Sequence, residues 1–164
     1  MHQARIAGEL VELRPARPDD LELLVGWLHD PEVYRWWGGH PVPEEEIRQK
    51  YTGARSPRVR SYIIERDRVP VGYAQSWRAG ELSGGIDMFL APDARGRGLG
   101  TDAARALADH LTRVEGWRRV TVDPEEDNAR ALHMWRRAGF VQTGQTTSDG
   151  RPELVFRPQA RRRY

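Results

Sequence analysis

The chain has no cysteine among its 164 residues. Disulfide bonds, thiolate chemistry and zinc sites built on cysteine are therefore excluded. It also has no run of about 18 apolar residues, and its N-terminus lacks the basic-then-apolar order of a signal peptide, so we expect a soluble, cytoplasmic protein without membrane contacts. The length favours a single domain over residues 1–164, because it allows one proper core but not two.

A large excess of charge of either sign is also missing. Lysine and arginine number 26 against 24 aspartates and glutamates, which gives a formal net charge of +2. Part of that excess lies at Arg161–Arg163, within residues 158–164, which we expect to form a flexible basic tail. Basic tails are more often solvated ends than nucleic-acid contacts, so we expect no nucleic-acid partner.

The hydrophobic pattern predicts a mixed α/β (α+β) chain in which antiparallel hairpins precede one strand–turn–helix–strand unit. No internal repeat and no linker divides it. Strands are expected at residues 10–15, 61–65, 69–77, 84–90, 119–122, 140–142 and 154–156, and helices at residues 18–28, 43–52, 101–114 and 128–138. Asp67-Arg68 and Asp149-Gly150 are the expected hairpin turns.

The most informative motif is the glycine-rich turn RGRGLGT, which lies between an apolar strand and a helix. Its glycines leave backbone N–H groups free to point at one anion, and the N-terminus of the following helix adds a positive field. Two arginines supply fixed charge beside it. The turn therefore predicts a pyrophosphate site, whose candidate residues are Arg95, Gly96, Arg97, Gly98, Leu99, Gly100 and Thr101.

One alternative for this turn is a dinucleotide site, because Gly98-x-Gly100-x-x-Ala103 fits that fingerprint and Asp123 follows about twenty residues later. Against it, residues 91–97 separate the glycines from the preceding strand, and the first ninety residues are hairpins. Too little chain remains to complete a doubly wound sheet. A Walker A loop is excluded because Gly-Lys-Ser/Thr is absent.

Arg95 to Gly100 also matches the R/Q-x-x-G-x-G/A turn by which acyltransferases of the GNAT superfamily hold the pyrophosphate of acetyl-CoA. Downstream, Asn128-x-x-Ala131 and Trp135-x-x-x-Gly139-Phe140 resemble that superfamily's next strand–helix–strand element. Within it, the chain is similar to the aminoglycoside 6'-N-acetyltransferases from about residue 9 to residue 156. The strings that carry this likeness are WWGG (36–39), GYAQS (72–76), GID (85–87), GLGT (98–101), DPEEDN (123–128) and AGF (138–140).

The resemblance implies a GNAT fold, with a mixed, mostly antiparallel sheet of about six or seven strands, splayed near Asp87, and helices on both faces. It implies acetyl-CoA as co-substrate, bound also by Asn128 and by backbone N–H groups around Phe89 and Leu90, and no metal. The acceptor is expected to be a small polycationic amine, and the protein a monomer or homodimer.

Asp87 is a charged residue inside an otherwise apolar strand. An alkylamine is mostly protonated at pH 7 and must lose a proton before it attacks a thioester, and a carboxylate can accept that proton. Asp87 matches the family's catalytic aspartate, although a strand also places every second side chain in water.

Trp135 stands where the family normally has a tyrosine that protonates the departing CoA thiolate. An indole N–H donates hydrogen bonds but does not ionise near neutral pH, so Trp135 is equally well explained as a packed helix residue. A thiol of pKa about 8.5 leaves tolerably without an acid; water or His133 are other donors.

A polyamine sugar needs carboxylates for its ammonium groups and aromatic faces for its rings. By motif, the substrate-binding candidates are Trp37, Tyr51, Gln75, Asp87, Asp123 and Asp149. Each has a structural alternative as a core, strand-end or turn residue. Some family members have a long acidic insertion where this chain has only residues 77–84, with Glu81 as the sole acid.

The sequence thus predicts an acetyl-CoA-dependent N-acetyltransferase that modifies a primary amine of an aminoglycoside, the 6'-amino group being favoured. Two alternatives stay open. One is acetylation of a small metabolite amine such as a hydroxylysine-type siderophore precursor, and the other is a non-catalytic acyl-CoA sensor.

Overall fold

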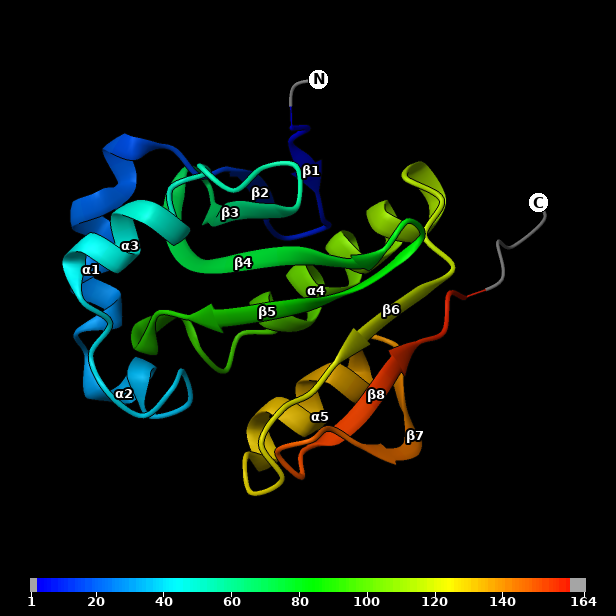
Figure 1. Cartoon of the computed structure of the whole chain (residues 1–164). Helices are drawn as coiled ribbons and strands as arrows, with labels where there is room; N and C mark the ends of the chain where they lie inside the picture. Colours follow the sequence, from blue (N-terminus) through cyan, green and yellow to red (C-terminus); the bar gives the residue numbers. More distant parts are fainter. Residues whose placement is uncertain (1–2, 160–164) are drawn as a thin grey trace.

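A computed structural model describes residues 3–159 (Figure 1). The basic end of the expected tail, Arg161–Arg163, lies outside the described residues. The strands are β1 (Ile6–Ala7), β2 (Glu12–Pro15), β3 (Val59–Arg66), β4 (Val69–Gly80), β5 (Ser83–Leu90), β6 (Arg119–Val122), β7 (Phe140–Thr146) and β8 (Pro152–Phe156). The α-helices are α1 (Leu21–Leu28), α2 (Pro31–Tyr34), α3 (Glu44–Lys50), α4 (Leu99–Asp109) and α5 (Ala129–Arg137).

Three shorter turns of helix complete the order: the 3-10 turns η1 (Pro18–Asp20) and η2 (Pro92–Ala94), and the π-helical turn η3 (His110–Val114) that ends α4. The expected helix at residues 101–114 therefore begins two residues earlier, at Leu99, and changes pitch in its last turn. None of the helices between residues 3 and 159 is long and apolar enough to cross a membrane.

The strands form one mixed sheet in the order β1-β2-β3-β4-β5-β6-β8-β7. Every neighbouring pair is antiparallel except β5 and β6, which run parallel. The mostly antiparallel sheet expected from the sequence is confirmed, but the expected six or seven strands are eight. The additional strand, β1, has only two residues, which is too short to leave a periodic pattern.

The sheet is splayed where the sequence predicts it to be. β5 and β6 pair only over Ser83–Gly85 and Arg119–Thr121. Beyond Gly85, β5 continues along β4 as far as Leu90, while β6 turns away with β8 (Figure 1). Asp87 lies two residues past the last β5–β6 pair, so its strand borders an open gap in the sheet.

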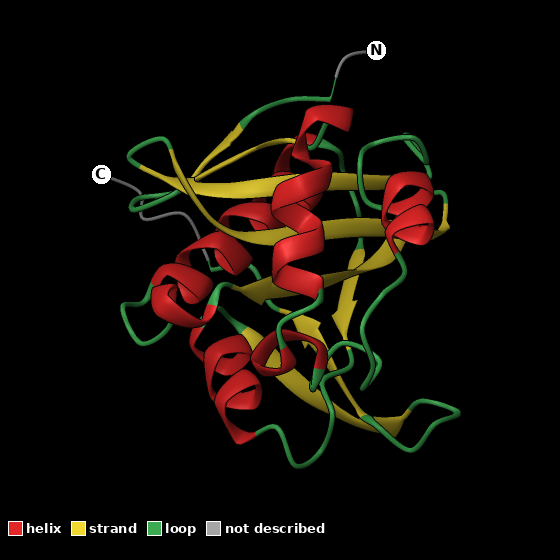
Figure 2. Cartoon of the chain, turned by 90° about the vertical axis from the view of Figure 1, so that its left-hand side faces the viewer, coloured by secondary structure: helices red, strands yellow, loops and turns green. Residues whose placement is uncertain are grey.

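Helices pack on both faces of the sheet, which Figure 2 shows as one curved layer of strands. Alternate residues of the central strands point to opposite faces. Tyr62 and Ile86 join a core cluster with α4 and α5, whereas Ile63 and Tyr73 join a second cluster with α1, α2 and α3. The gap between β5 and β6 therefore opens between two sets of packed helices.

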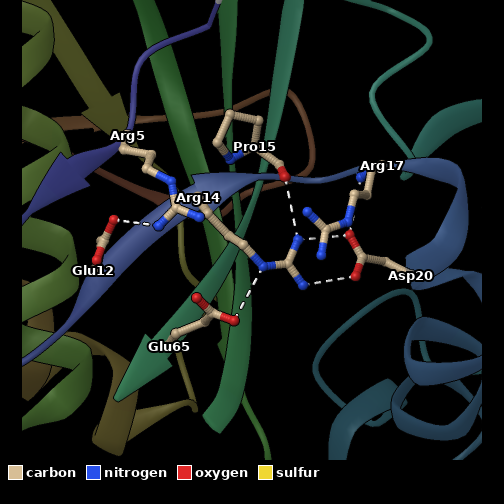
Figure 3. A network of polar contacts seen from close by, with 7 residues as sticks. All are labelled: Arg5, Glu12, Arg14, Pro15, Arg17, Asp20 and Glu65. Atoms are coloured by element: carbon tan, nitrogen blue, oxygen red, sulfur yellow. Dashed lines mark hydrogen bonds and ion pairs between the residues drawn. The ribbon is translucent and has the colours of Figure 1, made fainter. Parts of the chain in front are cut away.

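A buried ion pair fixes the start of the first helical segment. Arg14 of β2 and Asp20 of η1 are each 5% exposed, and two guanidinium nitrogens of Arg14 donate to the carboxylate over 2.7 and 2.9 Å (Figure 3). Glu65 of β3 accepts a third hydrogen bond from Arg14. Burial opposes ionisation of Asp20, but the hydrogen bonds from Arg14 and from the N–H of Arg17 outweigh it and lower the pKa of Asp20.

A second carboxylate connects the N-terminal hairpin with the helix that follows the glycine turn. Asp102, in the first turn of α4, accepts hydrogen bonds from the backbone N–H groups of Glu9, Leu10 and Val11 at 2.8–3.0 Å. Those three donors belong to the β1–β2 turn and have no partner in a strand. Asp102 thereby holds the N-terminal end of α4 against the sheet.

Candidate active site

A cleft of about 680 Å³ lies at the gap between the diverging strands. Its walls come from α2 and the segment between α2 and α3, from β4 and β5, from α5 and the loop before it, and from Arg151 in the β7–β8 loop. Most of the residues expected to form the site line this one cavity: Trp37, Tyr51, Gln75, Asp87, Phe89, Leu90, Arg95, Gly100, Asp123, Asn128 and Trp135. Of the other candidates, Gly96, Arg97, Gly98, Leu99, Thr101 and Asp149 do not line it.

Asp87 is half-buried and faces this cleft rather than open water. The register of β4 and β5 places Gln75 directly beside it, and Gln75 Nε2 donates to Asp87 Oδ2 over 2.9 Å. Burial raises the pKa of Asp87, and the hydrogen bond from Gln75 and the charge of Arg151 only partly oppose that effect. Asp87 is therefore a carboxylate whose proton affinity is increased by its surroundings.

A chain of hydrogen bonds fixes the orientation of Gln75. The hydroxyls of Ser61 and Tyr73 are 2.8 Å apart, and Tyr73 donates to Gln75 Oε1 over 2.8 Å. Arg55 donates to the same oxygen over 3.2 Å. Because both partners are donors, the amide oxygen must face them and the amide nitrogen must face Asp87. Sequence reasoning missed Tyr73, which lay within the GYAQS string but carried no separate signal.

The free backbone edge of β5 supplies hydrogen-bonding groups to the cleft. Ala91 N–H donates to Val71 on β4, and because antiparallel pairs alternate, Phe89 is also directed at β4. Met88 and Leu90 then present their backbone groups to the other side, where β6 has parted from β5. The expectation of free N–H groups around Phe89 and Leu90 thus moves by one residue, to Met88 and Leu90.

The glycine turn adopts left-handed backbone conformations that glycine alone adopts without strain. Gly96 has φ +79° and Gly98 has φ +76°, and open space surrounds the position of a Cβ atom at each. Gly98 caps α4, so the free N–H groups of the first helical turn start immediately after it. Leu99 itself has a fully buried side chain, so it offers only its backbone to a ligand.

Two residues of this region, Arg95 and Asn128, hold their positions through backbone contacts. Arg95 donates to the carbonyl of Glu32 over 2.7 Å, which joins the turn to α2. Asn128 accepts from the N–H of Ala131 over 3.2 Å and so caps α5 at the edge of the cleft. Arg97 is exposed beside the turn.

Aromatic rings form one wall of the cleft. Trp37 Nε1 donates to the hydroxyl of Tyr51 over 2.7 Å, and the Trp37 ring meets the Phe89 ring edge-on at 5.1 Å. Burial raises the pKa of Tyr51. The sequence left open whether Trp37 and Tyr51 belong to the core or to the site. Both residues belong to the core and to the site, because they pack with Phe89 and also line the cavity.

Carboxylates and one arginine form the opposite wall. Asp123, at the end of β6, has its pKa raised by burial, against the charge of Arg151. Arg151 forms ion pairs with Asp123 at 2.9 Å and with Asp149 at 3.4 Å. Asp149 thus contacts the site through Arg151 and does not line the cavity itself. Arg151 was missed from the sequence, where only its position after the Asp149-Gly150 turn was informative.

Trp135 is a buried residue of α5. It is 4% exposed, and its ring meets Phe140 edge-on at 5.1 Å. It also lines the cavity, so packing and contact with a ligand are both open to it. Among the described residues, no group of histidine, aspartate and glutamate side chains is arranged to hold a metal ion.

Comparisons with known proteins find relatives of this chain in both sequence and fold. The family description that matches residues 17–148 is that of an acetyltransferase (GNAT) domain. The aminoglycoside N(6')-acetyltransferase type 1 of Klebsiella pneumoniae is 30% identical over 175 aligned residues, which cover 96% of this chain and 87% of that protein.

Solved structures of AAC(6')-Ib are similar in fold and sequence. The complex with paromomycin and acetyl-CoA superposes with a TM-score of 0.81 at 32% identity and covers 90% of this chain and 93% of that one. The complex with coenzyme A and kanamycin gives a TM-score of 0.79 at 31% identity over 88% of this chain and 93% of that one.

Proposed function

Because the chain belongs to the GNAT acetyltransferase family, we propose that it transfers the acetyl group of acetyl-CoA to a primary amine of an aminoglycoside, with the 6'-amino group as acceptor. The relatives named above support both substrates, since one solved structure is a complex with acetyl-CoA and another holds kanamycin. One domain carries the proposed site, which is supported by the single sheet to which every described strand belongs.

In the proposed complex, the pyrophosphate of acetyl-CoA lies on the N–H groups of residues 96–101, with Arg95 and Arg97 beside it. The open Cβ positions at Gly96 and Gly98 support this placement, because they leave room for a close approach of the ligand. The backbone groups of Met88 and Leu90 then meet the amide-bearing arm of the cofactor in the gap between β5 and β6, and Asn128 borders its other side.

Asp87 is the proposed base. The acceptor ammonium transfers one proton to the carboxylate, and the neutral amine attacks the thioester carbonyl. The C–S bond then breaks to release CoA as a thiolate, and the attacking nitrogen loses its second proton to solvent, which leaves the neutral amide. The observation that carries the proposal is the position of Asp87. It is a half-buried carboxylate of raised pKa that lies in the cleft, beside the free edge of β5.

The acceptor is proposed to lie between the two walls of the cleft. Trp37 and Tyr51 offer ring faces to the sugar, while Gln75, Asp87 and Asp123 offer hydrogen bonds and negative charge to its amines. The β4–β5 connection is short, residues 81–82, and does not line the cleft, so the proposed acceptor site has no wall from a long acidic insertion.

The test is steady-state turnover with acetyl-CoA and kanamycin or tobramycin, compared with simple diamines and spermidine. The proposal expects kcat/KM at least tenfold higher for the aminoglycosides, with mass and NMR analysis placing the acetyl group on the 6'-nitrogen. Preference for a small diamine would favour the metabolite-amine alternative. Tight binding of acetyl-CoA without turnover of any amine would favour the sensor.

A further inference from the structure

Arg151 lies beside the carboxylates of the cleft, at a position where a cationic group of the substrate would be expected to bind. Arg151 lines the cleft together with Asp87 and Asp123, and its guanidinium forms an ion pair with Asp123 over 2.9 Å. A protein that binds polycationic amines gains affinity from unpaired carboxylates near the reacting end. Here one of those carboxylates already has a positively charged partner from the same chain.

The backbone of Arg151 is well anchored. Its N–H donates to Thr147 Oγ1 over 3.2 Å, and its carbonyl accepts from the N–H of Thr147 over 2.8 Å. These two bonds close the loop between β7 and β8 and fix the point from which the side chain starts. The hairpin thus fixes the backbone position from which the side chain reaches Asp123.

The ion pairing of Arg151 is incomplete, in contrast to that of Arg14. One nitrogen, Nη2, approaches both Asp123 and Asp149, while the buried Nε has no hydrogen-bond partner among the described residues. The side chain is also 39% exposed. A shared, single-nitrogen contact is weaker than a bidentate pair, so a substrate ammonium can displace it at moderate cost.

We propose that Arg151 is a specificity-determining residue, whose guanidinium competes with substrate ammonium groups for Asp123 and so selects acceptors that present a neutral group, such as a hydroxyl, at that position. This inference rests on the function proposed above. Acceptors with an ammonium group within reach of Asp123 must move Arg151 aside, whereas acceptors with a single reacting amine leave the pair intact.

The test compares Arg151→Gln with Arg151→Lys, which keeps the charge, and with Arg118→Gln. Arg118 is an exposed arginine at the opposite end of β6 from the cleft, and its removal changes the net charge equally. The probes are kanamycin, which has four amines, and methyl 6-amino-6-deoxyglucoside, which has one. Binding to each protein with CoA bound is measured by calorimetry, and KM and kcat are measured with acetyl-CoA.

We expect Arg151→Gln to bind kanamycin three- to tenfold more tightly and to lower its KM by the same factor. Binding of the monoamine should not change, and Arg151→Lys and Arg118→Gln should resemble wild type. If Arg151→Gln binds kanamycin no more tightly than wild type, in an enzyme that acetylates kanamycin, the inference about Arg151 is wrong but the proposed function stands. If no variant binds or acetylates either amine, the proposed function and this inference both fall.

Discussion

The side-chain amide of Gln75 donates a hydrogen bond to the carboxylate of Asp87, with Nε2 2.9 Å from Oδ2. Burial raises the pKa of Asp87, and this bond acts in the opposite direction because it favours the charged form. The balance between the two sets the pH at which Asp87 is able to accept a proton. The pair therefore connects the register of β4 and β5 with the proposed chemistry.

Asp87→Asn should reduce kcat by about 10²–10⁴-fold while leaving the affinity for acetyl-CoA nearly unchanged, because the amide keeps the shape but accepts no proton. In wild type, kcat/KM should fall as the pH drops through the raised pKa of Asp87, since the carboxyl must be ionised to act as the base. Measurement of kcat and of the pH profile checks both points.

The melting temperature of the same variant is its control. A carboxyl whose pKa is higher in the folded state than in the unfolded state begins to destabilise the fold as the pH rises past the unfolded value, and its full effect is present above the folded value. Asp87→Asn should therefore melt at the same temperature as wild type at pH 7, or higher. Near-normal turnover by Asp87→Asn would mean that water or another carboxylate accepts the proton of the acceptor ammonium.

Gln75→Leu should move the acidic limb of the kcat/KM profile to higher pH. The substitution removes the hydrogen bond that favours ionised Asp87, so the pKa of Asp87 rises further. A shift of the limb toward lower pH would contradict this account. The limiting rate on the alkaline side should change less than the rate on the acidic limb, which separates an effect on Asp87 from a general loss of activity.

Gly98→Val should weaken acetyl-CoA binding by at least tenfold. Residue 98 has φ +76°, and a side chain there would project into the open space proposed for the pyrophosphate. Gly116→Val is the matched control, because Gly116 has φ +75° and equally open surroundings but lies in the turn before β6.

Both glycine variants should lose similar amounts of thermal stability, since both place a β-branched residue in the left-handed region. Only Gly98→Val should lose the rise in melting temperature that acetyl-CoA produces. If acetyl-CoA raised the melting temperature of both variants equally, the pyrophosphate would not bind at this turn. A larger rise with NAD than with CoA would favour the dinucleotide alternative.

Sequence patterns predicted some elements and site residues of this protein and missed others. The strands around Ile63 and Ile86 and the helix after Gly98 have clear periodic or glycine signals, because long-range packing there agrees with local preference. Gln75 and Asp87 were also found, through their motifs. Arg151 was not, because its contact with Asp123 joins residues 28 positions apart and depends on how the β7–β8 hairpin packs against β6.

Asp20→Asn should reduce the free energy of unfolding by about 3 kcal/mol at pH 7, because it leaves the buried Arg14 guanidinium with Glu65 as its only carboxylate partner. The pKa of Asp20 is lowered in the folded state, so its contribution is present above the unfolded value of about 3.9 and is lost as the pH falls through the folded value. Urea denaturation at pH 7 and at pH 3 measures both effects.

The control for that experiment is Glu12→Gln, which removes the exposed ion pair between Glu12 and Arg5 (Figure 3). Water and salt screen this pair, so its loss should cost less than about 1 kcal/mol. The difference in the free energy of unfolding between wild type and Asp20→Asn should be smaller at pH 3 than at pH 7. A difference that did not change with pH would contradict the assigned role of the Asp20 carboxylate.

Trp135→Phe should retain most of the activity if the indole has no acid role, at a cost of about 1–2 kcal/mol of stability for the lost ring volume, since Phe still packs edge-on against Phe140. Trp135→Tyr tests the opposite case by placing a phenol on α5 within the cleft. If the tyrosine variant turns over at least tenfold faster, which corresponds to about 1.4 kcal/mol at the barrier, the wild-type enzyme lacks a proton donor for the thiolate. An unchanged rate would mean that CoA leaves unassisted, as a thiol of pKa about 8.5 permits. A large loss in both variants would instead assign the indole N–H a direct hydrogen bond to the reacting groups, because phenylalanine cannot replace that donor and tyrosine presents its hydroxyl at a different point.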